Sequence, residues 1–238
     1  MELQIENNVL LGFKRDDMWL NGEPEYMRLV VPDTVTAIAD FAFDGCKEII
    51  GVTIPGSVKS IGKEAFRFCR NLREIVMEEG VETIGDRAFQ MGFYGDVLIL
   101  PNSLCSIGVS AFDDTRMTAM RLPKDLKSIG AHAFHSCKDL ESASIPGTVT
   151  VIPKAVFADC WYLEEVTLAE GTQCIEAEAF AECRKLTQIK LPQSLIYLDK
   201  TAFREDWQLE KVWLPRHLKE QVEAAFQDVY PEVEYIYY

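Results

Sequence analysis

The sequence predicts an α/β fold in which the 238-residue chain winds into a right-handed solenoid with capped ends. We expect about nine to ten coils, whose strands lie together in one curved parallel β-sheet. Two observations support this. A phenylalanine returns at intervals of 23 residues, with one interval of 22, and two further series of apolar residues keep the same phase. Series that share one period are typical of repeat architectures, in which each unit packs on its neighbours.

The three series are easily read from the sequence. The first pairs an alanine or valine with phenylalanine, at Ala42-Phe43, Ala65-Phe66, Ala88-Phe89, Ala111-Phe112, Ala133-Phe134, Val156-Phe157, Ala179-Phe180, Ala202-Phe203 and Ala225-Phe226. The second is an aliphatic residue followed by proline, at Val31-Pro32, Ile54-Pro55, Leu100-Pro101, Leu122-Pro123, Ile145-Pro146, Leu191-Pro192 and Leu214-Pro215. Met77-Glu78 and Leu168-Ala169 continue it without proline. The third lies five residues before each phenylalanine, at Ile38, Ile61, Ile84, Ile107, Ile129, Ile152, Ile175 and Leu198.

Each repeat begins with a short strand. In residues 72–77, apolar side chains at the first, fourth and sixth places predict a strand with one face directed inward. Proline ends the strand in most repeats, because it has no N–H for the ladder. The Val-x-x-Ile-Gly-x-x-Ala-Phe stretch that follows predicts a turn and a short helical segment that returns the chain on the outer side.

The ends differ from the middle, as the ends of a solenoid must to cover the exposed core. We expect an N-terminal cap over residues 1–25, the repeat array over 26–215 and a C-terminal cap over 216–238. Leu218, Val222, Phe226 and Val229 have the spacing of an amphipathic helix. Residues 233–238 predict a final strand that pairs with the last strand of the array.

The repeat resembles the BspA-like leucine-rich repeats of the Treponema pallidum type. That unit runs Leu-x-x-Ile-x-Leu-Pro-x-x-Val-x-x-Ile-Gly-x-x-Ala-Phe-x-x-Cys, and residues 49–69 and 140–160 show it most fully. The match extends over residues 31–214. The resemblance implies a curved solenoid with binding roles, often at bacterial cell surfaces, and it implies no catalytic residue.

Charge and termini exclude several partners. The net charge is −14, which repels the phosphates of nucleic acids and anionic membranes. The opening segment Met1–Asn8 lacks the basic start and apolar stretch of a secretory signal, and no stretch reaches membrane-spanning length. As given, the chain is expected in the cytoplasm without membrane insertion. If Met1 is not the native start, the cell surface or secretion is the expectation instead.

The positions of the residues with reactive side chains are explained by the repeat and do not indicate a catalytic site. Cys46, Cys69, Cys137, Cys160 and Cys183 stand three residues after the repeat phenylalanine, so we expect buried free thiols without metal or cofactor. His132 and His135 face outward in the repeat phase while Cys137 faces inward, which excludes a tetrahedral site. The acidic pair Glu164-Glu165 is interpreted as solvating charge. We therefore expect no catalytic residues and no enzyme activity.

A binding patch is predicted in the C-terminal half. The residue after the cysteine position is basic in most repeats but becomes tryptophan in two, and tryptophan is enriched at interfaces. The patch comprises Trp161, Tyr162, Arg184, Lys190, Trp207 and Trp213. Alternatively, Trp161 and Trp207 fold back as lids over the edge of the solenoid.

Three kinds of partner remain open. The leading hypothesis is a protein or peptide bound on the concave face and edge. The second is self-assembly through the C-terminal tail or the apolar patch of Val76 and Ile99, and the third is a surface adhesin that binds carbohydrate.

Overall fold

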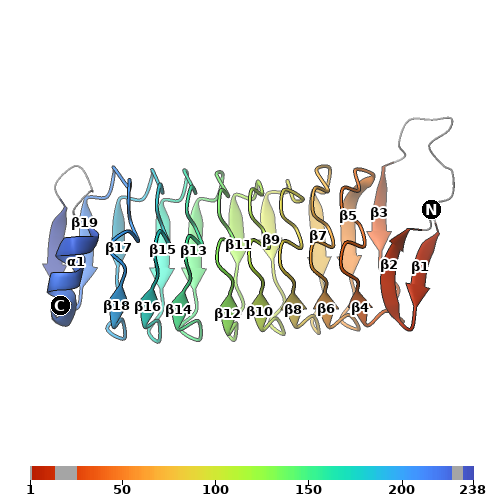
Figure 1. The fold of residues 1–238 in the computed structure, drawn as a ribbon, viewed down its shortest axis with the longest axis horizontal. Helices are drawn as coiled ribbons and strands as arrows, with labels where there is room; N and C mark the ends of the chain where they lie inside the picture. Colours follow the sequence, from red (N-terminus) through yellow and green to blue (C-terminus); the bar gives the residue numbers. More distant parts are fainter. Residues whose placement is uncertain (1, 14–25, 227–232) are drawn as a thin grey trace.

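The coils stack side by side along one long axis. A computed structural model of the chain describes residues 2–13, 26–226 and 233–238. Strands β1 and β2 lie at one end of the stack, and helix α1 and strand β20 lie at the other (Figure 1). Between them each coil adds one longer strand to one row and one two-residue strand to a second row. The predicted solenoid of parallel strands is therefore confirmed.

The longer strands form the first row. They are β3 (Met27–Val30), β5 (Ile49–Ile54), β7 (Glu74–Met77), β9 (Val97–Ile99), β11 (Ala119–Arg121), β13 (Ser142–Ile145), β15 (Glu165–Leu168), β17 (Gln188–Lys190), β19 (Lys211–Leu214) and β20 (Glu234–Tyr237). Neighbours are parallel and residues one repeat apart face each other, as Val52 faces Ile75. Alternate side chains are buried, so one face of this row packs on the core and the other faces solvent.

Pairing in the first row is interrupted between β7 and β9. The chain departs from the repeat at residues 92–95, just before β9. In this segment the side chain of Phe93 is fully buried. Gly92 lies so close to the backbone of the preceding coil that a Cβ atom would stand 2.2 Å from the Phe66 carbonyl oxygen. Only glycine permits this approach. The irregularity therefore has a packing cause.

The short strands form a second ladder, which differs from the single sheet that the sequence predicts. They are β4 (Ala37–Ile38), β6 (Ser60–Ile61), β8 (Thr83–Ile84), β10 (Ser106–Ile107), β12 (Ser128–Ile129), β14 (Val151–Ile152), β16 (Cys174–Ile175) and β18 (Tyr197–Leu198). The residue after a short strand is often glycine, and its N–H donates to the preceding coil, as that of Gly130 does to the Ile107 carbonyl. Pro153 takes the place of that glycine and has no N–H, and the ladder is interrupted there between β12 and β14.

The segment around each repeat phenylalanine is a turn, and the prediction of a short helix there is wrong. In most coils the residues two before and two after the phenylalanine have positive φ, as Glu64 (φ 56°) and Phe68 (φ 57°) do around Phe66. A helix needs consecutive right-handed residues, so this alternation prevents one. The spacing of the apolar residues resembles a helix, but hydrogen bonds to the next coil decide the conformation.

Those hydrogen bonds make a third ladder along the axis. The N–H groups of Glu64, Phe66 and Phe68 donate to carbonyl oxygens of the next coil at 2.9, 2.7 and 2.9 Å. The same three positions donate in the same direction in coil after coil, at Phe41, Phe43 and Gly45 and at Ala155, Phe157 and Asp159. The left-handed residues orient alternate amides along the axis. Their conformational cost is offset by this pairing of the turn backbone.

The repeat phenylalanines stack into one aromatic column through the core. Each ring from Phe43 to Phe226 lies 4.9–5.8 Å from the next, and the ring planes differ by 2–22°. Phe13 meets the first ring edge-on at 5.0 Å and Tyr235 meets the last at 6.2 Å. The repeat rings are 0–3% exposed. The column thus spans the array and is closed at both ends by rings from outside the repeats.

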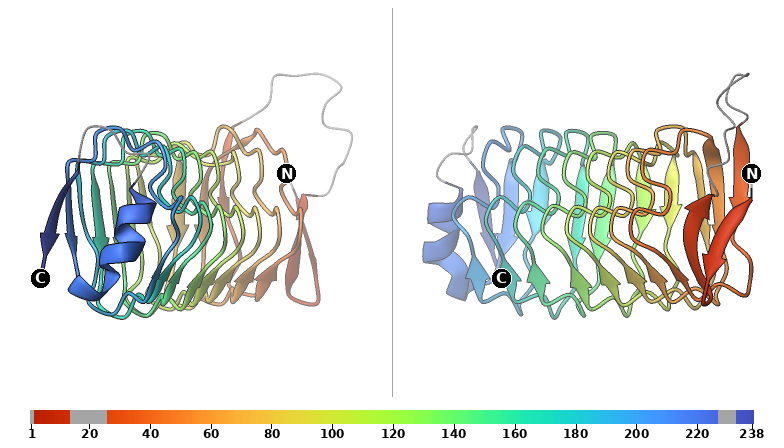
Figure 2. Two further views of the ribbon diagram at one scale, coloured as in Figure 1. Left: turned by 60° about the vertical axis from the view of Figure 1, so that its left-hand side comes forward. Right: turned by 45° about the vertical axis from the view of Figure 1, so that its right-hand side comes forward.

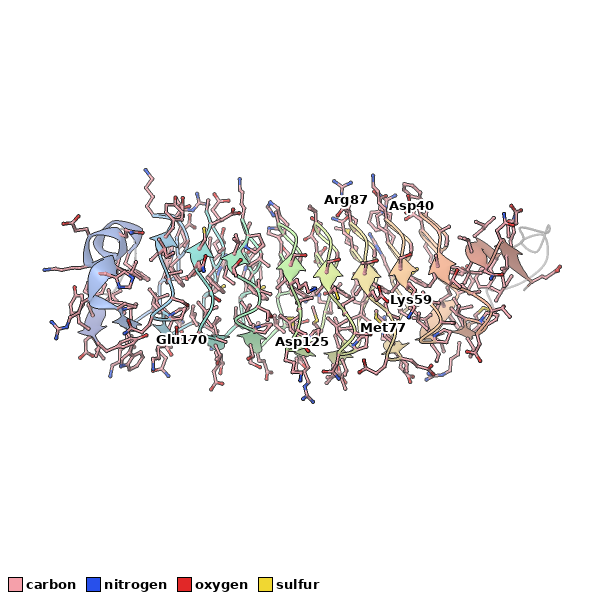
Figure 3. All side chains as sticks on the ribbon, turned by 90° about the horizontal axis from the view of Figure 1, so that it is seen from below. Asp40, Lys59, Met77, Arg87, Asp125 and Glu170 are labelled. Atoms are coloured by element: carbon pink, nitrogen blue, oxygen red, sulfur yellow. The ribbon has the colours of Figure 1, made fainter. Side chains whose placement is uncertain are left out.

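Two repeats lack the proline that ends the longer strand, and a glutamate with a glycine replaces it. Glu170, labelled in Figure 3, accepts the backbone N–H groups of Gln193 and Ser194 at 3.0 and 3.1 Å. Gly171 (φ 116°) donates its N–H to the Ser194 hydroxyl at 2.8 Å. Glu79 makes the same contacts with its own next coil. Hydrogen bonds between coils therefore hold the turn that proline holds elsewhere.

The first coil follows an antiparallel hairpin, β1 (Leu3–Glu6) and β2 (Val9–Phe13), and β2 pairs with β4. The N-terminal cap predicted over residues 1–25 falls partly outside the described residues. At the other end, the 3-10 helix η2 (Arg216–Leu218) leads into α1 (Lys219–Ala225), which lies across the end of the stack in both views of Figure 2. Leu218, Val222 and Phe226 are buried, and Val229 lies outside the described residues.

Helix α1 completes the hydrogen bonds of the short-strand ladder with a side chain. The amide of Gln221 accepts the Leu198 N–H at 3.0 Å and donates to the Ile196 carbonyl at 3.1 Å. The equivalent carbonyl one coil earlier, that of Gln173, accepts from the backbone of the next coil. The Gln221 side chain therefore replaces the peptide group of a coil that does not follow. On the row of longer strands, β20 pairs in parallel with β19.

The aromatic column generates the first prediction. Phe134→Ala removes a fully buried ring with neighbours on both sides, so it is expected to lower the free energy of unfolding by about 3–5 kcal/mol. Urea titration followed by circular dichroism measures this. Phe41→Ala is the control, because Phe41 is 49% exposed, and it is expected to cost less than about 1 kcal/mol. Equal losses in the two variants would contradict the proposed column.

The cap on the short-strand ladder generates the second prediction. Gln221→Ala leaves the Leu198 N–H and the Ile196 carbonyl without their partner, and it is expected to cost about 1–3 kcal/mol. Hydrogen exchange of the Leu198 amide is expected to become faster in this variant. Gln173→Ala is the matched control, because Gln173 is exposed and it contributes its backbone to the ladder. An unchanged Leu198 exchange rate would refute the role given to Gln221.

Candidate functional site

The residues four places after the repeat phenylalanines form a row along one corner of the solenoid. In four consecutive coils this place holds Lys138, Trp161, Arg184 and Trp207. The Lys138 ammonium lies 4.2 Å from the centroid of the Trp161 ring, and the Arg184 guanidinium lies 4.4 Å from it. The Trp161 indole N–H donates to Asp159. Trp161 is therefore half-buried between side chains of its own chain, much as the lid alternative anticipates.

Trp207 is in a different position, although it occupies the same place in its coil. Its side chain is 64% exposed. It lines a hollow of about 390 Å³ together with Arg184, Glu182, Glu205 and Gln208. Arg184 is held by an ion pair with Glu182 at 3.0 Å. This hollow offers one open aromatic face, one guanidinium and two carboxylates.

A second hollow lies on the solvent-facing side of the longer strands. It has about 400 Å³ and is lined by residues of β15, β17 and β19, among them Glu165, Thr167, Lys190 and Trp213. Lys190 faces Trp213 across the pair β17 and β19. The Lys190 ammonium lies 5.0 Å from the centroid of the Tyr238 ring, and the Tyr238 hydroxyl donates to the Leu191 carbonyl. The C-terminal residue thus holds Lys190 at the edge of the hollow.

The structure therefore places four of the six predicted binding residues in two hollows, and Trp161 and Tyr162 line neither. Arg184 and Trp207 line the first hollow, and Lys190 and Trp213 line the second. Tyr162 is 52% exposed and lines neither.

Sequence reasoning missed the acidic residues of both hollows. Glu182 and Glu205 stand two places after a repeat phenylalanine, where residue type varies from coil to coil. Glu164 and Glu165, interpreted from the sequence as solvating charges, line the second hollow. The sequence pattern that could have identified these residues is the recurrence of carboxylates at fixed places of the repeat, beside a tryptophan in the same or the next coil.

Four of the five cysteines that follow the repeat phase are buried free thiols, and the fifth, Cys46, is a partly buried one. The thiols of Cys69, Cys137, Cys160 and Cys183 donate to the carbonyl of a phenylalanine in the preceding coil at 3.2–3.3 Å. Burial raises the pKa of Cys137 to about 12, so the neutral thiol is the stable form. Within the described ranges, no three His, Cys, Asp or Glu side chains gather as metal ligands do. His135 instead contacts Asp113 at 2.9 Å.

Asp206 occupies the cysteine place in its coil and is fully buried directly before the exposed Trp207. One carboxyl oxygen accepts the Cys183 N–H at 2.7 Å. The other oxygen, Oδ2, has no hydrogen-bond partner among the described residues. Loss of hydration by burial, with a smaller contribution from the nearby Glu182 charge, raises the pKa of Asp206 well above its usual range. The core beneath the first hollow therefore contains a carboxylic acid that is stable in its neutral form.

The family model of the BspA type leucine rich repeat region matches residues 24–141 and 127–237. The chain belongs to the BspA-type leucine-rich-repeat family. No protein with curated annotation matches it. None of the helices in the described ranges is long and apolar enough to cross a membrane.

Solved structures of other leucine-rich-repeat proteins share the fold of this BspA-type chain. The T. pallidum leucine rich repeat protein is 25% identical with a TM-score of 0.68, over 78% of this chain and 87% of that one. A leucine-rich repeat protein from Bacteroides ovatus is 18% identical with a TM-score of 0.52, over 100% of this chain and 98% of that one. The second likeness concerns the fold alone.

The buried acid generates the third prediction. Because the folded state raises the pKa of Asp206 above its ordinary value of 3.8, the folded protein binds this proton more tightly than the unfolded chain does. The contribution of Asp206 to the free energy of unfolding is therefore fully present below about pH 4. It decreases as the pH rises, by up to about 1.4 kcal/mol per pH unit, until the pH reaches the pKa of the folded state.

Asp206→Asn cannot ionise, so the difference in the free energy of unfolding between this variant and the wild type is expected to grow from pH 4.5 to pH 7.5. Urea titrations at a series of pH values measure it. Glu205→Gln is the control, because Glu205 lines the open hollow, and it is expected to show no such trend. Parallel pH curves for wild type and Asp206→Asn would show that Asp206 is ionised in the folded protein.

Proposed function

We propose that this chain is a non-enzymatic binding module that recognises a protein or peptide through the C-terminal half of its solenoid. The observation that carries the proposal is the pair of hollows of about 390 and 400 Å³, each lined by a tryptophan and by charges of both signs. Tryptophan and arginine dominate interface hot spots, because they bury much area and keep a polar group. An extended partner would contact the corner and the solvent-facing side of the strands together.

The scaffold beneath the hollows supports this role. β15, β17 and β19 are held in one parallel register, so Thr167, Lys190 and Trp213 stand at fixed intervals across the second hollow. Side chains on a rigid sheet lose little conformational freedom on binding. The buried thiols of the cysteine ladder, with pKa values raised by burial, support a non-enzymatic role, because they are stable as neutral groups.

The fourth prediction tests the binding function. A library of random peptides displayed on phage is selected on the immobilised chain, and the enriched peptides are synthesised. Trp213→Ala is expected to weaken their binding at least about 10-fold in titration calorimetry, as truncation of an interface tryptophan does. Val76→Ala, on the same sheet face near the other end, is the matched control and is expected to bind as wild type does.

Two outcomes would contradict the proposal. One is that no peptide is enriched, and the other is that Val76→Ala abolishes binding while Trp213→Ala leaves it unchanged. Light scattering over a range of concentrations checks the competing self-assembly hypothesis. We expect the mass of one chain throughout, because a net charge of −14 opposes association of identical chains.

A further inference from the structure

Cations and aromatic rings alternate along the corner row of the solenoid. Lys138, Trp161, Arg184 and Trp207 follow one another in consecutive coils, and coils in such a stack advance by about 4.7–4.9 Å. The two faces of the Trp161 ring are covered by Lys138 at 4.2 Å and Arg184 at 4.4 Å. A cation over the face of an indole is attracted by the negative charge of the ring face. The row thus pairs Trp161 with a cation on each side.

Trp207 lacks this pairing. It is 64% exposed, and among the residues that the structure describes no lysine or arginine lies over its ring. Several other surface aromatics have a cation of their own chain within 6 Å, as Phe41 has Lys63, Phe68 has Arg67, and Tyr94 has Arg73. Trp207 therefore presents an indole face that no cation of the described residues covers.

The surroundings of Trp207 favour a positive ligand. The hollow in front of it is lined by two carboxylates, Glu182 and Glu205, and by one guanidinium, Arg184. Arg184 is already engaged by Glu182 at 3.0 Å, whereas Glu205 makes a longer ion pair, with the Arg204 Nε at 3.5 Å. Glu205 also belongs to the same coil as Trp207. The acidic field of the whole chain acts in the same direction, because it attracts cations and repels carboxylates and phosphates.

We propose that the open face of Trp207 binds an arginine or lysine side chain of a partner, with Glu205 as the counter-ion, so that this chain recognises a basic peptide segment. The proposal rests on the proposed binding function and names the chemistry of the partner. Arginine fits best, since its planar guanidinium stacks on an indole and donates hydrogen bonds to a carboxylate at the same time. The partner's cation takes the place that Arg184 takes over Trp161.

The fifth prediction uses a defined peptide, acetyl-(Arg-Ser)₃-amide, titrated into the 15N-labelled full chain. The indole N–H signal of Trp207, assigned by its loss in Trp207→Ala, is expected to shift and saturate. Trp207→Ala is expected to raise the Kd about 5-fold or more, measured on the neighbouring backbone amides, as loss of a cation–π contact implies. This substitution leaves the net charge unchanged, so non-specific attraction between an acidic chain and a basic peptide is the same in both proteins.

Two matched controls accompany the titration. Tyr162→Ala removes another exposed aromatic residue, and it is expected to leave the Kd unchanged. Glu205→Gln is expected to raise the Kd about 3-fold, as loss of a partly exposed charge contact does. Glu141→Gln removes the same charge from an exposed residue that lines neither hollow, and it is expected to leave the Kd unchanged. Circular dichroism spectra of all variants establish that each is folded.

Three results would overturn the proposal: an unshifted Trp207 signal, equal affinity in wild type and Trp207→Ala, or equal affinity for the matched peptide acetyl-(Glu-Ser)₃-amide. Failure here is distinguishable from failure of the binding function. If the peptides enriched on the chain lack a basic residue and depend on Trp213 but not on Trp207, the chain is a binding module and the assignment of a cation to Trp207 is wrong.

Discussion

The backbone of each coil depends on the two neighbouring coils for its hydrogen bonds. The longer strands and the short strands pair only with the equivalent strands one repeat away, and the turn at each phenylalanine donates its N–H groups to the next coil. An unpaired buried peptide group costs free energy, so the donors and acceptors of neighbouring coils must stay aligned. All three ladders therefore require that the coils have the same length. Loss of one residue before Phe134 is accommodated, since the turn hydrogen bonds from Phe112 to Ala133 continue at 2.8 Å.

Departures from the repeat are where this BspA-type chain acquires individual features. Pro153 removes a donor and interrupts the short-strand ladder, and Asp206 replaces a cysteine with a buried acid. Directly after Asp206, Trp207 replaces a basic residue and turns outward. A binding surface on a solenoid arises in this way, because the ladders fix the backbone and leave the outward places free to vary. The two hollows lie in the last third of the array.

Much of the fold follows from the sequence, because its signals are repeated many times. The phenylalanine column, the inward cysteines, the final parallel strand and the buried face of the C-terminal helix all follow from residue spacing. The turn around Phe66 does not, because its apolar spacing resembles a helix and its left-handed residues are ordinary ones such as Glu64. The sequence also does not predict that Trp161 is covered while Trp207 is exposed. Whether a surface ring is covered depends on Lys138 and Arg184, which lie one coil away on each side.

The turn ladder also gives the solenoid a direction. From Phe43 to Phe180, the amide of each repeat phenylalanine donates toward the C-terminal end of the array, as Phe43 does to Ala65 and Phe180 does to Ala202. An uncovered first coil would present acceptors and an uncovered last coil would present donors, so bare ends match one another head to tail. A contact of that kind does not close on itself, and it propagates as a filament. The β1–β2 hairpin and helix α1 occupy those two ends, and their presence converts a structure with the geometry of a fibre subunit into a molecule of finite length.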